Sequence, residues 1–272
     1  MKFNDDYLLN YLSSAPLPLA IERGMECEIF SHQNISYPIL DLGCGDGLFT
    51  LNLFVDKVKT GIDPNSNELQ RAKISGLYNE LINCYGDFIP KERNCYNTII
   101  SNSVLEHIPD LQPVLKEVYR LLTDDGHFFV TLPTDKFDQY SIFNQVLLKL
   151  RLNETAQKYR FIFNKFWRHY HYYSPDEWKK IFNQAGFEVV DEIEYGTKQI
   201  CLLDDFLVLF SGFSFLTKKI LNRWILFPNF RRRYMRCISF FLKKIIRQSI
   251  YIKNGGLIFL NLKKTKENRV LS

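Results

Sequence analysis

Short apolar runs alternate along the chain with segments in which apolar residues recur at helical spacing. The apolar runs predict buried strands at about 38–42, 57–62, 81–85, 96–101, 127–132, 187–193 and 257–262. Between the fourth and fifth of these, Ile108, Leu111, Leu115, Val118 and Leu122 mark one face of a helix. Alternating strands and helices favour right-handed βαβ units. We therefore predict an α/β fold with a seven-stranded, doubly wound, mostly parallel sheet.

The pattern changes in three places, and these changes suggest how the chain is organised. Residues 1–36 are predicted to be an irregular, partly helical lead-in to an alternating domain at 37–272. Two helical insertions interrupt that domain. The first, at about 137–173, is crowded with aromatic residues, and the second, at about 204–252, is predicted to form two amphipathic helices.

Overall composition adds little to this picture, but the distribution of charge adds much. The 272 residues are 46% hydrophobic and 24% charged, which is usual for a globular protein and excludes disordered, collagen-like and disulfide-scaffold chains. The stretch 206–266 contains 14 Lys and Arg and no Asp or Glu. The remaining 21 Lys and Arg against 30 Asp and Glu leave a net charge of −9. The formal charge of +5 is therefore the sum of a basic segment, 206–266, and an acidic remainder of the chain.

The basic segment has three interpretations. Leu216, Ile220 and Trp224 share a helical face, and Lys218 and Arg223 lie on the other. An apolar face beside a cationic one fits a helix on an anionic membrane surface, or one that meets a lipid-linked substrate. It fits equally a helix that packs on the core and shows a solvated basic face. A nucleic-acid groove is disfavoured, because the body of the domain has few clustered basic residues.

The beginning of the sequence and the cysteines suggest a cytoplasmic protein. The first residues, MKFNDDYLLNYL, carry two aspartates where a secretory signal needs basic and then apolar residues. Charge-free stretches are about a dozen residues long, as at 206–217, so no transmembrane helix is expected. The cysteines show neither close pairs nor zinc-site spacing, and we predict no metal site; they are Cys27, Cys44, Cys84, Cys95, Cys201 and Cys237.

A glycine-rich loop follows the first predicted strand and precedes a helix. Gly43, Gly45 and Gly47 allow a tight turn and close approach of a ligand, and the helix N-terminus offers free N–H groups. Asp63 ends the second strand 20 residues after Gly43, where an acid can reach the hydroxyls of a ribose. The third glycine of the dinucleotide pattern is replaced by Leu48, which disfavours a nicotinamide cofactor.

Four motifs in this region resemble those of class I S-adenosylmethionine-dependent methyltransferases, especially the methyltransferase type 11 group. They are DLGCGDG (41–47), GIDPN (61–65), GDF (86–88) and SNSVLEHIPD (101–110). The resemblance covers about 36–135 and implies a Rossmann-like methyltransferase fold with S-adenosyl-L-methionine as cofactor. The cofactor-binding residues that it implies are Asp41, Gly43, Cys44, Gly45, Asp63, Pro64, Asp87, Phe88, Ser101 and Asn102.

The resemblance also implies an enzyme that methylates a small-molecule or lipid- or glycan-linked acceptor. His107 follows the fourth strand and is a candidate base for an oxygen acceptor, or else a residue of local packing. The aromatic segment 169–173 is a candidate cover for the acceptor pocket. Arg23 is a candidate partner of the cofactor carboxylate, or else a solvent-exposed side chain. The alternatives are a membrane-associated binding protein with an inactive methyltransferase fold, and an NAD-dependent oxidoreductase.

Overall fold

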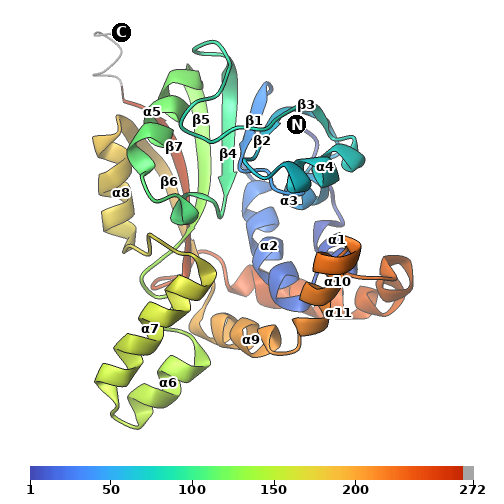
Figure 1. Cartoon of the computed structure of the whole chain (residues 1–272), viewed down its shortest axis with the longest axis vertical. Helices are drawn as coiled ribbons and strands as arrows, with labels where there is room; N and C mark the ends of the chain where they lie inside the picture. Colours follow the sequence, from blue (N-terminus) through green and yellow to red (C-terminus); the bar gives the residue numbers. More distant parts are fainter. Residues whose placement is uncertain (266–272) are drawn as a thin grey trace.

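Seven strands form one sheet with helices on both faces in the computed structural model, which describes residues 1–265 (Figure 1). The strands are β1 (Ile39–Leu42), β2 (Val58–Ile62), β3 (Tyr78–Ile82), β4 (Tyr96–Asn102), β5 (Leu122–Pro133), β6 (Phe187–Tyr195) and β7 (Leu257–Lys264). Their order is β3-β2-β1-β4-β5-β7-β6, and β7 runs antiparallel to both of its neighbours. The predicted α/β class and seven-stranded, mostly parallel sheet are confirmed.

The helices occupy the connections between strands, the N-terminal region and two insertions. They are α1 (Tyr7–Ser14), α2 (Leu17–Phe30), α3 (Leu48–Leu53), α4 (Ser66–Ser75), the 3-10 helix η1 (Leu105–His107), α5 (Leu111–Leu121), α6 (Ile142–Lys149), α7 (Asn153–Trp167), α8 (Pro175–Gln184), α9 (Lys198–Val208), α10 (Gly212–Leu221) and α11 (Pro228–Gln248). Figure 1 shows α6 and α7 projecting below the sheet on one side, with α9, α10 and α11 beneath it on the other.

Neighbouring residues of the central strands enter two separate hydrophobic cores. Ile100 and Phe129 pack with residues of α1, α2 and α11. Ile99 and Phe128, one position away on the same strands, pack with residues of α5 and α8. Because a parallel sheet is covered on both faces, its strands are apolar at consecutive positions rather than at alternate ones. This is why continuous apolar runs marked the strands in the sequence.

The third strand lies at Tyr78–Ile82 rather than at the predicted 81–85. It pairs in parallel with β2, from Val58 opposite Tyr78 to Ile62 opposite Ile82. Since β2 ends at Ile62, the backbone of β3 has no partner strand on that side beyond Ile82. The apolar residues that follow belong to a loop.

The two insertions also differ in detail from the prediction. The first forms α6 and α7, and its last residues, 168–173, are not helical because the chain leaves α7 through a left-handed Arg168. The second contains three helices instead of two and begins at Lys198. The irregular lead-in is mostly two helices, α1 and α2, which are largely buried against the sheet.

Among residues 1–265, no single helix is long and apolar enough to cross a membrane. The pair α9 and α10, which meet at a bend of 60°, meets that requirement of length and composition when taken together.

Candidate active site

The glycine-rich loop connects β1 to α3 at the carboxyl edge of the sheet. Gly43 and Gly45 adopt left-handed backbone conformations, with φ of +75° and +53°. A Cβ on Gly43 would lie 2.5 Å from Cγ1 of Val104, whereas a Cβ on Gly45 would have no neighbour within 4 Å. Gly43 is therefore needed for packing against the segment after β4. Gly45 leaves an open space along the backbone in which a ligand can approach.

The Asp41 side chain is buried, and its hydrogen bonds hold the start of this loop against neighbouring elements. It is 3% exposed, and its Oδ2 accepts hydrogen bonds from the Thr50 hydroxyl and, at 2.6 Å, from the Tyr78 hydroxyl. Burial raises the pKa of Asp41 to about 6. The resemblance implied that Asp41 binds the cofactor. The contacts that the structure describes for it are internal, and they tie the loop to α3 and β3.

Asp63 presents a fixed carboxylate beside the same loop. Its Oδ2 accepts a hydrogen bond from the Gly45 N–H at 3.0 Å, and its Oδ1 accepts one from the Asn65 N–H at 2.8 Å. The side chain is partly exposed, and partial burial raises its pKa. Parallel strands end at one edge of the sheet, and β1 and β2 are neighbours, so Asp63 lies where the ribose of a nucleoside on the loop would be.

The other predicted cofactor residues fall into buried and exposed groups. Cys44 is buried within the loop, and burial raises the pKa of its thiol. Pro64 and Asp87 are exposed, and Phe88 is 73% exposed on the loop after β3. An aromatic side chain this exposed has room on its face for a flat ring such as adenine.

At the end of β4, a buried network connects the strand to α2. Asn102 donates hydrogen bonds to Glu26 Oε2 at 2.8 Å and to Thr131 Oγ1 at 2.7 Å. Arg23 Nη1 donates hydrogen bonds to Glu26 Oε2 and to Ser103 Oγ, both at 2.6 Å. Arg23 has a side chain only 16% exposed, so the alternative of a solvent-exposed arginine is wrong.

Ser101 precedes this network on β4. Its hydroxyl is fully buried, and no hydrogen-bond partner for it exists within residues 1–265. A buried polar group without a partner is costly and calls for an explanation such as a missing ligand or water. Together with the open space at Gly45 and the fixed carboxylate of Asp63, this orphaned hydroxyl fits a polar cofactor at the carboxyl ends of β1, β2 and β4.

A cavity of about 280 Å³ lies next to the cofactor edge. Its walls come from α2, the end of β4, η1, α7, α9 and α10. Ser103 lines the cavity, and its neighbour Val104 packs against the backbone of Gly43. The cavity therefore lies beside the glycine-rich loop, although the sequence places most of its lining residues far from that loop.

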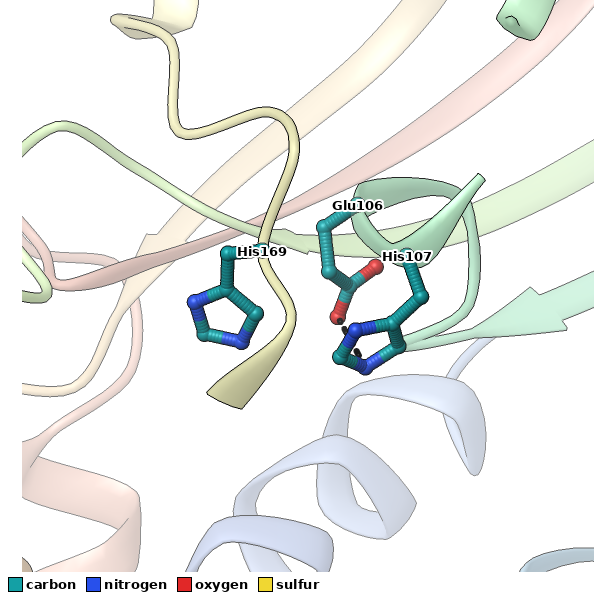
Figure 2. A group of neighbouring side chains, drawn as sticks. All are labelled: Glu106, His107 and His169. Atoms are coloured by element: carbon teal, nitrogen blue, oxygen red, sulfur yellow. Dashed lines mark ion pairs between the residues drawn. The ribbon is translucent and has the colours of Figure 1, made fainter. Parts of the chain in front are cut away.

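Three side chains in this cavity form a compact cluster, shown in Figure 2. Glu106 and His107 come from η1, and His169 comes from the segment after α7. One potential ligand atom from each residue lies within 4.8 Å of those from the other two, and His107 Nε2 is 3.9 Å from Glu106 Oε1. Sequence reasoning singled out His107 but missed Glu106. It suggested the segment of His169 only as a cover for the pocket.

Hydrogen bonds determine which nitrogen of His107 is free. Its Nδ1 lies 3.1 Å from the backbone oxygen of Arg168, and a carbonyl oxygen only accepts. Nδ1 therefore carries the proton, and Nε2 has a free lone pair that faces the cluster (Figure 2). His169 Nδ1 is likewise 3.3 Å from the Asn164 side-chain oxygen, which leaves its Nε2 available.

Burial sets the charge of the cluster. It raises the pKa of Glu106 to about 8, lowers the pKa of His107, and lowers the pKa of His169 to about 4. Near pH 7 both imidazoles are therefore neutral, and the carboxyl group is largely protonated. Each residue also offers an atom of the kind that binds metal ions. The spacing of the cysteines predicted no metal site, and the sequence did not reveal this cluster, whose third member, His169, is distant along the chain.

Glu106→Gln is expected to stabilise the protein increasingly as the pH rises. The folded-state pKa of about 8 exceeds the ordinary value of 4.5, so the folded protein keeps a proton that the unfolded chain releases between these values. Stability is lost across this window, by about 1.4 kcal/mol per pH unit at most, and the variant escapes that loss. Thermal unfolding with a chelator present should show almost no gain at pH 4, below the ordinary value, and a clear gain at pH 8.5. The exposed control Glu92→Gln should show none, and parallel pH profiles for Glu106→Gln and the natural protein would contradict the assignment.

Comparisons with known proteins agree with this geometry. A model of the methyltransferase domain family matches residues 13–192. A ubiquinone biosynthesis O-methyltransferase of Vibrio atlanticus is 27% identical over 108 residues, which are 38% of this chain and 46% of that protein. A sterol 24-C-methyltransferase of Pneumocystis carinii is 26% identical over 171 residues, 59% of this chain and 42% of that protein. The chain thus spans less than half the length of these two relatives.

A solved S-adenosylmethionine-dependent methyltransferase of Thermotoga maritima has the same fold. It superposes with a TM-score of 0.57 at 14% identity, over 90% of this chain and 92% of the other. The match over most of the domain shows that the chain belongs to the methyltransferase domain family. The chain has the Rossmann-like methyltransferase fold that its motifs implied, and its family membership disfavours the nicotinamide alternative.

Proposed function

We propose that this methyltransferase acts on a hydroxyl oxygen of a small molecule, either free or carried by a lipid or a glycan. The observation that carries the proposal is the free Nε2 lone pair of His107 in a cavity beside the glycine-rich loop. An oxygen acceptor must lose its proton as the new bond forms, and a neutral imidazole is suited to receive it. One relative is named an O-methyltransferase and another a sterol 24-C-methyltransferase, so the choice of oxygen rests on His107.

Asp63 and Phe88 are assigned to binding the cofactor, and His107 is assigned to the acceptor. When bound, S-adenosylmethionine supplies a methyl group on a positively charged sulfur. Asp63, whose carboxylate is held by the Asn65 N–H, would accept hydrogen bonds from the ribose hydroxyls, and the exposed ring of Phe88 would cover the adenine. His107 Nε2 would take the hydroxyl proton of the acceptor as the methyl–oxygen bond forms and the methyl–sulfur bond breaks, leaving the neutral thioether S-adenosylhomocysteine, and would later release the proton to water. Holding both reactants in one orientation lowers the barrier by roughly 7–11 kcal/mol.

The lining of the cavity also favours an acceptor with several hydroxyl groups. Burial raises the pKa of Glu22 to about 7 and raises that of Asp204. Burial favours the protonated form of Asp204, which can both donate and accept hydrogen bonds, whereas Glu22, 3.3 Å from Arg23, is partly ionised near pH 7 and then only accepts. Trp167 and Trp224 add aromatic surfaces to the same cavity. Such a combination of polar groups and flat apolar rings suits a ring that bears hydroxyls, as in a quinol or a sugar.

A labelled methyl donor tests this function. The protein is incubated with labelled S-adenosylmethionine and with phenols, quinols, sugars, amines, and lipid-linked forms of the sugars and quinols, and the products are examined by mass spectrometry. We expect the label on an oxygen of a hydroxyl-bearing acceptor. Transfer to nitrogen or carbon instead would overturn the oxygen assignment. Calorimetric binding of S-adenosylhomocysteine, measured alongside, separates a wrong acceptor from an absent cofactor site.

A further inference from the structure

The end of the molecule formed by α6, α7 and α9–α11 exposes large apolar side chains. Phe166 on α7 is 75% exposed, Phe210 after α9 is 71% exposed, and Phe240 on α11 is 78% exposed. Phe143 on α6 and Phe213 on α10 are also exposed. Soluble proteins seldom expose apolar residues in this concentration unless the surface binds something. The packing interpretation of the basic segment does not explain these outward-facing rings.

These helices belong to one end of the fold. Figure 1 shows α6 and α7 and the row α9, α10 and α11 beneath the sheet. The backbone N–H of Ile142, at the start of α6, donates a 2.8 Å hydrogen bond to Asp205 on α9. Buried residues of α9 and α11, among them Ile200 and Met235, belong to one hydrophobic core. The apolar rings are therefore carried by helices that are held together.

The same end is positively charged. Arg233, Arg236 and Lys244 on α11 are exposed. No Asp or Glu occurs from 206 to the end of the described chain, whereas the rest of the protein is acidic. On the other side, the 142–168 segment has six basic residues and a single acidic one, Glu154. Two copies of this face would repel each other, so a self-association partner is disfavoured by charge.

We propose that this end of the molecule docks on an anionic phospholipid bilayer. Exposed aromatic and aliphatic side chains enter the boundary between headgroups and acyl chains, and the lysines and arginines meet the lipid phosphates. A nucleic acid would match the charge but not the aliphatic side chains, such as Leu209, Leu216 and Ile220, which are exposed among the basic residues. The bilayer satisfies both features at once.

The docking surface is continuous with the cofactor edge and with the acceptor cavity. Phe215 on α10 is 44% exposed and also lines the cavity. Lys218, one turn further along α10, pairs with Asp46 of the glycine-rich loop and, at 3.4 Å, with Glu68 of α4. Docking would therefore place a wall of the cavity at the membrane. Binding to the membrane is independent of the proposed oxygen acceptor.

Vesicle flotation tests the docking. We expect the protein to float with vesicles of phosphatidylcholine and phosphatidylglycerol, and to remain unbound with phosphatidylcholine alone. The variant Phe210→Ser, Phe213→Ser, Phe240→Ser should lower the bound fraction at least about tenfold, because each ring loses its burial in lipid. The variant Arg233→Glu, Arg236→Glu, Lys244→Glu should do the same by reversing the charge, and high salt should release the natural protein.

A matched control removes exposed apolar side chains elsewhere. Val55, Ile74 and Val190 are all exposed outside the docking surface, and their replacement by serine should leave flotation unchanged. Calorimetric binding of S-adenosylhomocysteine, retained in every variant, shows that each one is folded. The proposal is overturned if the natural protein does not float with the anionic vesicles, or if the control variant loses binding as much as the phenylalanine variant does.

Discussion

Asp63→Ala is expected to weaken binding of S-adenosylhomocysteine by about a hundredfold or more. The carboxylate is held in place by N–H groups of Gly45 and Asn65, and its remaining lone pairs face the space beside the loop. Hydrogen bonds to a charged group contribute about 1.5–3 kcal/mol each. Losing those to two ribose hydroxyls therefore removes at least about 3 kcal/mol, and each 1.4 kcal/mol is a factor of ten in affinity.

Isothermal titration measures this effect directly, with Glu92→Ala as the matched control. Glu92 is exposed in the loop before β4, so its removal should leave the affinity unchanged. Circular dichroism of Asp63→Ala confirms that the fold survives, which matters because the carboxylate also orients Gly45. Affinity within a few fold of the natural protein would show that Asp63 does not hold the ribose.

His107→Asn is expected to lower kcat by about a hundredfold to ten-thousandfold, the range of general base catalysis. Asparagine keeps an N–H group that can donate to the Arg168 carbonyl, but it has no basic nitrogen in place of Nε2. Binding of S-adenosylhomocysteine should stay unchanged, because His107 lines the acceptor cavity rather than the glycine-rich loop. The effect is measured with the acceptor found by the labelled-methyl screen.

The pH profile separates a base from a residue that only packs. Burial lowers the pKa of His107 below the ordinary 6.5, so the neutral, proton-accepting form predominates at pH 7. The rate of the natural protein should fall as the pH drops through that pKa, and this acidic limb should vanish in His107→Asn. His169→Asn is the companion variant, and its effect should be smaller because a group with a pKa of about 4 is a weaker base. An unchanged limb in His107→Asn would assign the proton to another group.

The cofactor edge was the part of the site most accessible from the sequence. A glycine-rich loop after a strand and an acid at the end of the next strand are local patterns, because parallel neighbouring strands bring their ends to one edge. The positions of Gly43, Gly45 and Asp63 follow from that rule. The positions of most strands were recognisable as well, since continuous apolar runs mark strands that are buried on both faces.

The direction in which a side chain points was not accessible in this way. Asp41 belongs to the same motif as Gly43, yet its carboxylate faces Thr50 and Tyr78 inside the protein. Tyr78 lies 37 positions away, on a strand that the sequence placed three residues too late. Partners that come from different strands are brought together by sheet register, which local patterning does not encode.

By itself, the sequence determined the fold class, the methyltransferase family and the loop that receives the cofactor, because these depend on local periodicity and on short motifs at strand ends. Only the tertiary structure showed which residues line the acceptor cavity and which apolar side chains are exposed. The contact of His107 with His169, the burial that raises the pKa of Glu106, and the outward direction of the rings on α6, α7 and α9–α11 all depend on distant segments. Helical periodicity in 204–252 predicted apolar faces, but whether the core covers an apolar face is decided by the packing of the whole chain.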